Sequence, residues 1–379
     1  MPRKPISSDL LLEAVKAFQQ YGSKKTAAEA LGIQYDTFVT RCNRGIDRGF
    51  LLSEGAASAV RSAKLNPKEA KAGWIVQVDP ETKSRISTYW RAPEVDADDI
   101  IDLYKNAFDD VKKCDPILAP DVVNKDLLTV YPIMDAHFGM MAWGEETGDQ
   151  DYDTNIATQD MQHAFAKVCA LTPNSAHAVL LVGGDFFHAD DSRAETPKSK
   201  NKLDVDGRQW RIINSGIAIL ANIIDTLRSK HQSVQIRVLR GNHDEHSHLI
   251  LTFSLAERYR DDNRVDVEKN PHDLYMRRWG KCLISAHHGD KAKPDRLTMY
   301  LSDVCPYWSE TRHRYMMTGH IHHDAAKDIG PLRWESLRAF CPPDAYAAGM
   351  GYASRRALQA MTFHLVDGLV LRAIDPIDR

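Results

Sequence analysis

The chain has 379 residues, of which 27% are charged, and its formal net charge is −3 at pH 7. This length predicts a large core divided between about two domains. The near-neutral balance excludes a uniformly basic or acidic protein. The sequence also lacks an apolar run of about 18 residues, so no membrane-spanning helix and no membrane partner are expected.

The N-terminus predicts a protein that is not secreted. Acidic Asp9 and Glu13 interrupt the first apolar stretch, where a secretory signal requires an uncharged core. The six cysteines are scattered without a Cys-x-x-Cys pair, which favours reduced thiols and a cytoplasmic location. The sequence leaves open whether the chain forms a homo-oligomer.

Residues 1–62 are predicted to form a module of three short helices. Apolar residues recur at helical spacing in the first helix, and Ser23 is placed to cap the second. A turn at Gly32 then leads to a third helix, for which Asp36 is the expected cap. Phe38, with later apolar residues at helical spacing, is expected to face inward. This pattern resembles a helix-turn-helix of transcriptional regulators.

The third helix is predicted to present a basic face. Residues 1–64 hold ten Lys and Arg against six Asp and Glu, so this segment carries +4 within a chain of −3. Positive charge on one helix face is typical of DNA contact. A docking or oligomerisation module with a solvated basic face is the alternative. The predicted nucleic-acid contacts are Arg41, Arg44 and Arg48.

Residues 63–125 are predicted to form a β-hairpin followed by a connecting helix. The runs 73–78 and 85–90 are rich in strand-forming residues and flank a segment with the composition of a turn. Apolar residues in helical phase from 96 to 111 indicate an amphipathic helix. We find no pattern of catalytic residues in this segment.

Residues 126–379 are predicted to form a layered α/β domain, because helices and hairpins alternate along this part of the chain. Three segments have the periodicity of helices, and two pairs of short runs flank Gly-containing turns as hairpins. The expected helices are 155–170, 210–230 and 249–260, and the expected hairpins join 274–278 to 281–285 and 361–366 to 369–374.

Five short apolar runs in this domain each end in a loop that carries metal-ligand side chains. The runs 128–134, 178–182, 234–239, 282–285 and 315–318 each predict a buried strand. A strand that stops in such a loop is a rigid way to present catalytic groups. The loops are Asp135-Ala136-His137, Gly183-Gly184-Asp185-Phe186-Phe187-His188, Gly241-Asn242-His243-Asp244-Glu245, His287-His288-Gly289-Asp290 and Gly319-His320-Ile321-His322-His323.

The side chains of these loops predict a site for two divalent ions. They offer carboxylates, one amide and several imidazoles but no cysteine, a set that suits Mn²⁺, Fe or Zn²⁺ and disfavours a thiolate site. In an extended segment, Asp-x-His and His-x-His place alternate side chains on one side, so both can face one ion. Two ions roughly 3.5–4 Å apart, bridged by a carboxylate, suit phosphoryl transfer. We expect Mn²⁺, with Fe or Zn²⁺ as alternatives.

The ordered motifs Asp-x-His, Gly-Asp-x-x-His, Gly-Asn-His-Asp, His-Gly and Gly-His-x-His resemble those of the calcineurin-like metallophosphoesterases over residues 126–375. The resemblance implies a four-layer α/β/β/α sandwich with its metal site at one edge of two facing mixed sheets. It also implies a ligand set in which Asp185 bridges the ions: Asp135, His137 and His322 for the first ion, and Asn242, His288 and His320 for the second.

The same resemblance implies roles for histidines that are not ligands. His243 matches the histidine beside the scissile phosphate. His188 matches a second such histidine of the nuclease branch, which includes the double-strand-break repair nucleases. We expect Asp244 to orient His243 and its turn rather than to bind metal. His287 and His323 adjoin ligands, and on extended segments they are expected to point away from the ions.

These features together predict a metal-dependent phosphodiesterase of nuclease type with DNA as its substrate. Metal-activated hydroxide would attack phosphorus, and His243 would protonate the departing oxygen as general acid. The Gly-Asp-x-x-His motif, the basic first module and the absence of secretion or membrane signals favour nucleic acid. The alternatives are a phosphomonoesterase or protein phosphatase that uses the same site, and a non-enzymatic DNA-binding regulator.

Overall fold

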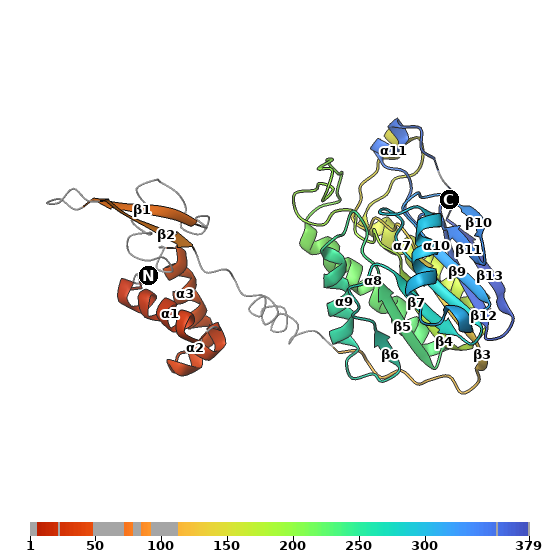
Figure 1. Cartoon of the computed structure of the whole chain (residues 1–379), viewed down its shortest axis with the longest axis horizontal. Coiled ribbons are helices and arrows are strands. Elements are labelled where there is room, and N and C mark those ends of the chain that lie inside the picture. The colour runs from red at the N-terminus through yellow and green to blue at the C-terminus, as the bar shows by residue number, and fades with distance from the viewer. Residues whose placement is uncertain are drawn as a thin grey trace. The chain divides into compact units, whose positions relative to one another are not determined.

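The computed structural model describes residues 6–21, 23–47, 72–78, 85–91, 113–353 and 355–377. The chain divides into two compact units, residues 1–110 and 111–379 (Figure 1). The predicted boundaries at residues 62 and 125 stay predictions. The connecting helix predicted at 96–111 lies outside the described residues.

The first unit begins with three helices, as predicted. They are α1 (Ser8–Tyr21), α2 (Lys24–Ala30) and α3 (Tyr35–Asp47). The Ser23 side chain caps α2 by accepting a hydrogen bond from the Thr26 amide at 3.2 Å, which confirms the predicted cap. Phe38 and Cys42 of α3 are fully buried against the other helices. The DNA-binding role of these helices stays a prediction.

Asp36 does not cap α3, so that prediction is wrong. A helix capped by Asp36 would begin at Thr37, but α3 begins two residues earlier, at Tyr35, which places Asp36 in its first turn. A carboxylate in this position interacts favourably with the positive end of the helix dipole. In the same unit, β1 (Ala72–Val78) and β2 (Arg85–Arg91) pair antiparallel, which confirms the predicted strands of the hairpin.

Two sheets form the centre of the second unit in the part of the chain that is described. The six-stranded sheet has the order β13 (Gly368–Pro376), β12 (Ala357–His364), β3 (Asn124–Ile133), β4 (Ser175–Val182), β5 (Ser233–Val238) and β6 (Val265–Val267). The five-stranded sheet has the order β10 (Ala325–Ile329), β11 (Leu332–Ser336), β9 (His313–Thr318), β8 (Cys282–Ala286) and β7 (Tyr275–Trp279). Strands β3 to β6 run parallel, as do β8, β9 and β11.

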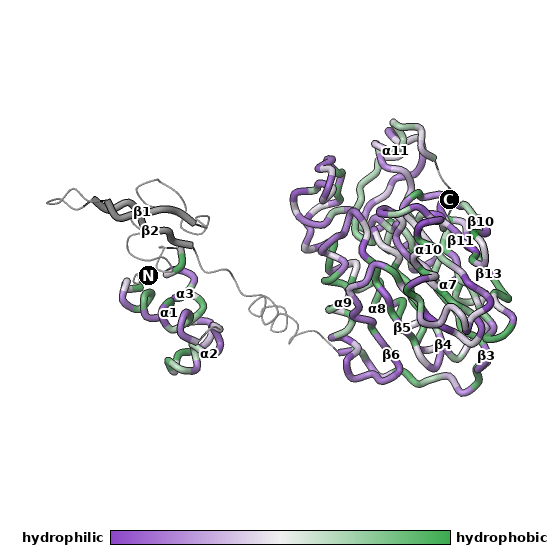
Figure 2. The backbone as a smooth tube through the Cα atoms, in the orientation of Figure 1, coloured by the Kyte–Doolittle hydropathy of each residue, from purple (hydrophilic) through white to green (hydrophobic). Residues whose placement is uncertain are grey.

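Alternating side chains of the central strands enter two different apolar layers. On β4, Leu180 packs with the helix-side cluster, whereas Leu181 packs into the cluster shared with the five-stranded sheet. This is the period of two that a strand imposes on its side chains. The second half of β4, residues 178–182, is buried on both faces and is continuously apolar. Figure 2 shows how apolar (green) and polar (purple) residues are distributed along the chain.

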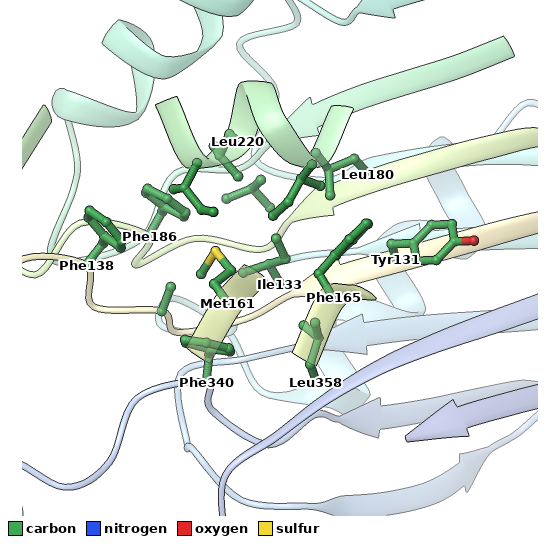
Figure 3. Close-up of a cluster of buried hydrophobic side chains, with 14 of the residues drawn as sticks. Tyr131, Ile133, Phe138, Met161, Phe165, Leu180, Phe186, Leu220, Phe340 and Leu358 are labelled. Atoms are coloured by element: carbon green, nitrogen blue, oxygen red, sulfur yellow. The ribbon is translucent and has the colours of Figure 1, made fainter. Parts of the chain in front are cut away.

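Helices cover the outer faces of both sheets. Three helices, α7 (Thr154–Leu171), α8 (Gln209–Lys230) and α9 (Ser247–Arg258), pack on the six-stranded sheet, where Phe165 and Leu220 meet Leu180 (Figure 3). Helix α10 (Pro294–Val304) packs Leu297 and Leu301 against the five-stranded sheet. The order helix, sheet, sheet, helix confirms the predicted four-layer architecture.

Short elements complete the described chain. They are α6 (Gly144–Thr147), the 3-10 helix Trp308–Glu310 and α11 (Ala345–Gly349). The helices predicted at 155–170, 210–230 and 249–260 are confirmed as α7, α8 and α9, within two residues at each end. Within the described ranges, we find no helix that combines the length and the apolar character needed to cross a bilayer.

Candidate metal centre

The five predicted loops follow β3, β4, β5, β8 and β9, and their backbones are bonded to one another. The His137 amide donates to the Asp185 carbonyl at 3.0 Å. The His320 amide donates to both carboxylate oxygens of Asp135, each at 2.9 Å. The His243 amide donates to Oδ1 of Asp185 at 2.8 Å. Loops far apart in sequence are thus fixed around two buried carboxylates.

The first group of donor atoms comprises Asp135, His137 and Asp185, whose ligand atoms lie within 4.8 Å of one another. His322 joins them, because its Nε2 lies 3.2 Å from Nε2 of His137 and 3.6 Å from Oδ1 of Asp135. These residues are the set that the sequence predicts for the first ion. Asp135 is fully buried and Asp185 is 1% exposed, and buried carboxylates in proteins are commonly paired or bound to a metal ion.

The second group comprises Asp185, His288 and His320, also within 4.8 Å of one another. Nε2 of His288 lies 3.2 Å from Oδ2 of Asp185 and 3.1 Å from Oδ1 of Asn242. Nδ1 of His288 donates to the Gly183 carbonyl at 3.1 Å, an arrangement that typically fixes a ligand ring and leaves Nε2 to bind. The structure therefore brings together every residue predicted for the second ion.

The protonation of this centre reflects its buried carboxylates. Burial opposes ionisation of Asp185, but His288 and other histidines lower the pKa of this carboxyl well below its ordinary value. Burial lowers the pKa of His288, but Asp185 and Asp135 oppose it and raise that pKa to about 10. The carboxylates thus favour positive charge at the point where the two donor groups meet.

Left-handed backbone conformations turn the ligand side chains inward. Among the described residues other than glycine, seven have positive φ, and five of these are predicted ligands. Such conformations cost about 1–3 kcal/mol each and persist where surrounding structure enforces them, often at functional sites. They are Asp135 at 47°, His137 at 43°, Asp185 at 50°, His320 at 69° and His322 at 60°.

These angles correct one expectation. The Asp-x-His and His-x-His segments are not extended, so alternation along a strand is not what aligns their side chains. The left-handed backbone conformation of these residues directs their side chains instead. His287 and His323 lie outside the donor groups among the described residues, with His287 buried and His323 exposed.

Glycines provide the space that the carboxylates occupy. A Cβ atom at Gly241 would collide with the carboxylate and the backbone nitrogen of Asp185, and one at Gly319 would collide with the carboxylate of Asp135. The glycines of Gly-Asn-His-Asp and Gly-His-x-His are therefore steric requirements of the site.

Gly241→Ala is expected to lower the free energy of unfolding by about 1–3 kcal/mol, as overpacking does, and to weaken metal binding by displacing Asp185. Gly349→Ala is the matched control, because a Cβ there meets no atom within 4 Å. Thermal unfolding and metal titration of both variants measure the effect. Equal stability and metal affinity in the two variants would contradict the steric requirement.

The two predicted non-ligand histidines adjoin the first donor group. His188 is 1% exposed, and its Nδ1 lies 3.0 Å from Nδ1 of His137. Burial and the neighbouring His243 lower the pKa of His188 to about 3, so its ring is neutral. Its Nε2 is buried without a hydrogen-bond partner in the described structure. The ring centroid of His243 lies 4.6 Å from that of His137.

Asp244 does not hold the His243 ring, which corrects the predicted contact. Nδ1 of His243 instead lies 2.8 Å from the backbone oxygen of His188. The Asp244 carboxylate accepts backbone amides from the loop after β4, including those of Asp185 and Phe186 at 3.2 and 2.8 Å, and the Gly241 amide at 2.8 Å. Burial and the charge of Asp185 raise the pKa of Asp244 to about 7. Asp244 therefore fixes the loop that carries Asp185 and His188.

Two residues near the centre are absent from the sequence-based prediction. Arg240 ties the loop after β5 to the loop after β8 by pairing with Glu245 at 2.9 Å and Asp290 at 3.0 Å. The sulfur of Cys341 belongs to a donor group with His137 and His322. No local sequence motif marks either residue, because Arg240 reaches Asp290, and Cys341 lies near His137, only in the folded chain.

The predicted DNA contacts belong to the first unit. Arg41 is half-buried and Arg44 is exposed on α3. Arg48 lies outside the described residues. Their contact with nucleic acid stays a prediction.

No protein-family model and no curated protein matches the chain. Similar solved structures include a predicted phosphoesterase from Streptococcus pneumoniae, with 10% identity, a TM-score of 0.29 and coverage of 66% of this chain and 98% of that chain. Vps29 from Entamoeba histolytica complexed with Zn²⁺ has 12% identity, a TM-score of 0.30 and coverage of 66% and 99%. An archaeal phosphodiesterase has 11% identity, a TM-score of 0.34 and coverage of 65% and 99%. These low values assign no function to the chain.

Proposed function

We propose that this protein is a phosphodiesterase that hydrolyses DNA at a centre of two divalent metal ions. One observation carries the proposal: Asp185 belongs to both donor groups, with His137 on one side and His288 on the other. A carboxylate shared in this way is the bridge that a two-metal site requires. The remaining donors are imidazoles, carboxylate and amide, which suit divalent ions such as Mn²⁺.

When bound, two divalent ions supply an activated water and neutralise charge on the phosphoryl oxygens. The chain's own contribution is to hold the donors rigidly. His288 is fixed through the Gly183 carbonyl, and the Asp185 carboxylate is fixed by the His243 amide. Ligands held by such surrounding bonds keep their orientation during the reaction.

His243 is the proposed general acid for the leaving oxygen. Its Nδ1–H donates to the His188 carbonyl, which leaves Nε2 to carry the second proton of the imidazolium. Proton transfer from Nε2 to the departing oxygen would avoid an alkoxide leaving group. The ring is half-buried, so the same nitrogen can regain a proton from solvent.

His188 is proposed to donate a hydrogen bond to a phosphoryl oxygen. Because His137 offers Nε2 to the first donor group, its proton lies on Nδ1 and is donated to Nδ1 of His188. The proton of neutral His188 then lies on Nε2, the atom that is buried without a partner in the described structure. A neutral donor of this kind stabilises charge but does not act as the acid.

A comparison of simple substrates tests the reaction class. Purified protein with Mn²⁺ is expected to hydrolyse an aryl phosphodiester faster than the corresponding monoester, and chelator is expected to abolish both activities. Labelled linear and circular DNA, with and without Mn²⁺, then test the substrate. Faster turnover of the monoester, with intact DNA, would instead identify a phosphomonoesterase.

The first unit is proposed to bind the DNA backbone through the basic face of α3. The double variant Arg41→Glu/Arg44→Glu is expected to weaken duplex binding and to lower the slope of log affinity against log salt by about 0.9 for each phosphate that is no longer neutralised. Phe38 and Cys42, which are fully buried, are not altered by these substitutions, so α3 is expected to keep its packing. Turnover of a small diester is expected to stay unchanged.

Lys16→Glu provides a charge-reversal control on the exposed face of α1. It is expected to leave the salt slope near its original value. Unchanged DNA affinity of the double variant at low salt would reduce the first unit to a docking or oligomerisation element.

A further inference from the structure

Cys341 lies at the first donor group although it belongs to none of the predicted metal-ligand loops. Its sulfur is within 4.8 Å of ligand nitrogens of both His137 and His322. The residue is 2% exposed and forms no disulfide. Among the described residues, it is the one cysteine that joins a group of potential metal donors. The thiol thus lies near two imidazoles whose ligand nitrogens are also within 4.8 Å of each other.

The backbone around Cys341 is bonded to the same loops that carry those imidazoles. The Cys341 amide donates to the Asp135 carbonyl at 3.3 Å, and the Ala339 amide donates to the His322 carbonyl at 3.3 Å. Behind this segment, the Arg356 guanidinium donates to the Phe340 carbonyl at 2.8 Å. These hydrogen bonds hold the backbone of residues 339–341 against the loops that carry His137 and His322, and they thereby restrict where the Cys341 sulfur can lie.

We propose that Cys341 supplies a thiolate ligand to the ion held by His137 and His322. This inference rests on the metal centre proposed above. On binding, the S–H bond breaks, its proton passes to solvent and its electron pair forms the bond from sulfur to the ion. The first position then has a soft donor that the second position, with Asn242, His288 and His320, lacks.

The thiolate changes the expected metal preference of the two positions. Soft sulfur selects Zn²⁺ or iron over Mn²⁺, whereas oxygen and imidazole donors accept Mn²⁺. A centre with different ions at its two positions follows from this asymmetry. The five loops alone disfavour a thiolate site, and Cys341 lies outside them.

Co²⁺ is the probe that reports the sulfur directly, because a bond from thiolate to Co²⁺ gives a charge-transfer band in the near ultraviolet. Full-length wild-type protein titrated with Co²⁺ is expected to show this band together with visible bands of the ion. Cys341→Ser is expected to keep the visible bands, to lose the charge-transfer band and to bind Zn²⁺ at least about 10-fold more weakly. Cys169→Ser, a buried cysteine on α7 outside the donor groups, is the matched control and is expected to keep both features.

The outcomes separate this inference from the proposed function. Co²⁺ that binds without a charge-transfer band in wild type, or with the band retained in Cys341→Ser, would overturn the thiolate ligand and leave the metal centre intact. If the wild type binds no Co²⁺, Zn²⁺ or Mn²⁺, the metal centre itself is wrong. Should Cys341→Ser fail to fold, a variant with the other five cysteines replaced by serine decides the matter. It must keep the band if Cys341 is the ligand.

Discussion

Asp185→Asn is expected to lower diester hydrolysis by more than about 10³-fold and to weaken binding at both metal positions. Asp185 is the residue common to the two donor groups, so the loss of its charge should weaken the binding of both ions. Metal ions contribute several kcal/mol of charge stabilisation in such sites. Because about 1.4 kcal/mol corresponds to a factor of ten in rate, a loss of this size follows. Metal content and steady-state turnover of the purified variant measure it.

Asp153→Asn is the control for this substitution. Asp153 caps α7 by accepting from the Ile156 amide at 2.7 Å, and asparagine caps helices equally well. Its activity and metal content are expected to match the wild type. Full activity of Asp185→Asn after treatment with chelator would refute a bridging role.

His243→Ala is expected to retain its metal ions and to lose at least about 10²-fold in rate on substrates with poor leaving groups, the usual scale for a general acid. The loss should shrink as the leaving group becomes more acidic, because such a group departs without a proton. Turnover of a series of diesters that differ only in leaving-group pKa measures this dependence.

His163→Ala tests the general effect of removing an imidazole, since His163 is exposed on α7. It is expected to leave turnover unchanged across the series. A constant loss in His243→Ala for all leaving groups would argue that His243 positions the substrate but transfers no proton.

Much of the centre is predictable because each ligand follows a strand that the sequence marks clearly. Val179 and Leu180 enter different apolar layers, so β4 is continuously apolar from residue 178 to residue 182 and is easily recognised there. The parallel arrangement of β3, β4 and β5 then places the ends of these strands at one edge. The resemblance of the ordered motifs, rather than residue order alone, groups Asp135, Asp185 and Asn242 into one site without knowledge of the strand pairing.

Other features depend on contacts that local sequence does not encode. Strand β10 is largely exposed, so it lacks the apolar pattern of a buried strand and forms by pairing with β11. Helix α10 follows Lys293 without a side-chain cap, although Pro294 at its first position and Asp295 in its first turn are usual starting signals. The proximity of Cys341 to His137 joins residues about 200 positions apart, and it is visible only in the folded chain.

The two sheets contribute donors unequally but jointly to each proposed ion. The six-stranded sheet leads to Asp135, His137, Asp185 and Asn242, whereas the five-stranded sheet leads to His288, His320 and His322. Bound ions would therefore link the two sheets at the edge of the sandwich where these loops lie. When chelator removes the ions, the backbone amides at the C-terminal ends of β8 and β9 should exchange hydrogen faster. The amides of β4, which the helices cover, should stay protected.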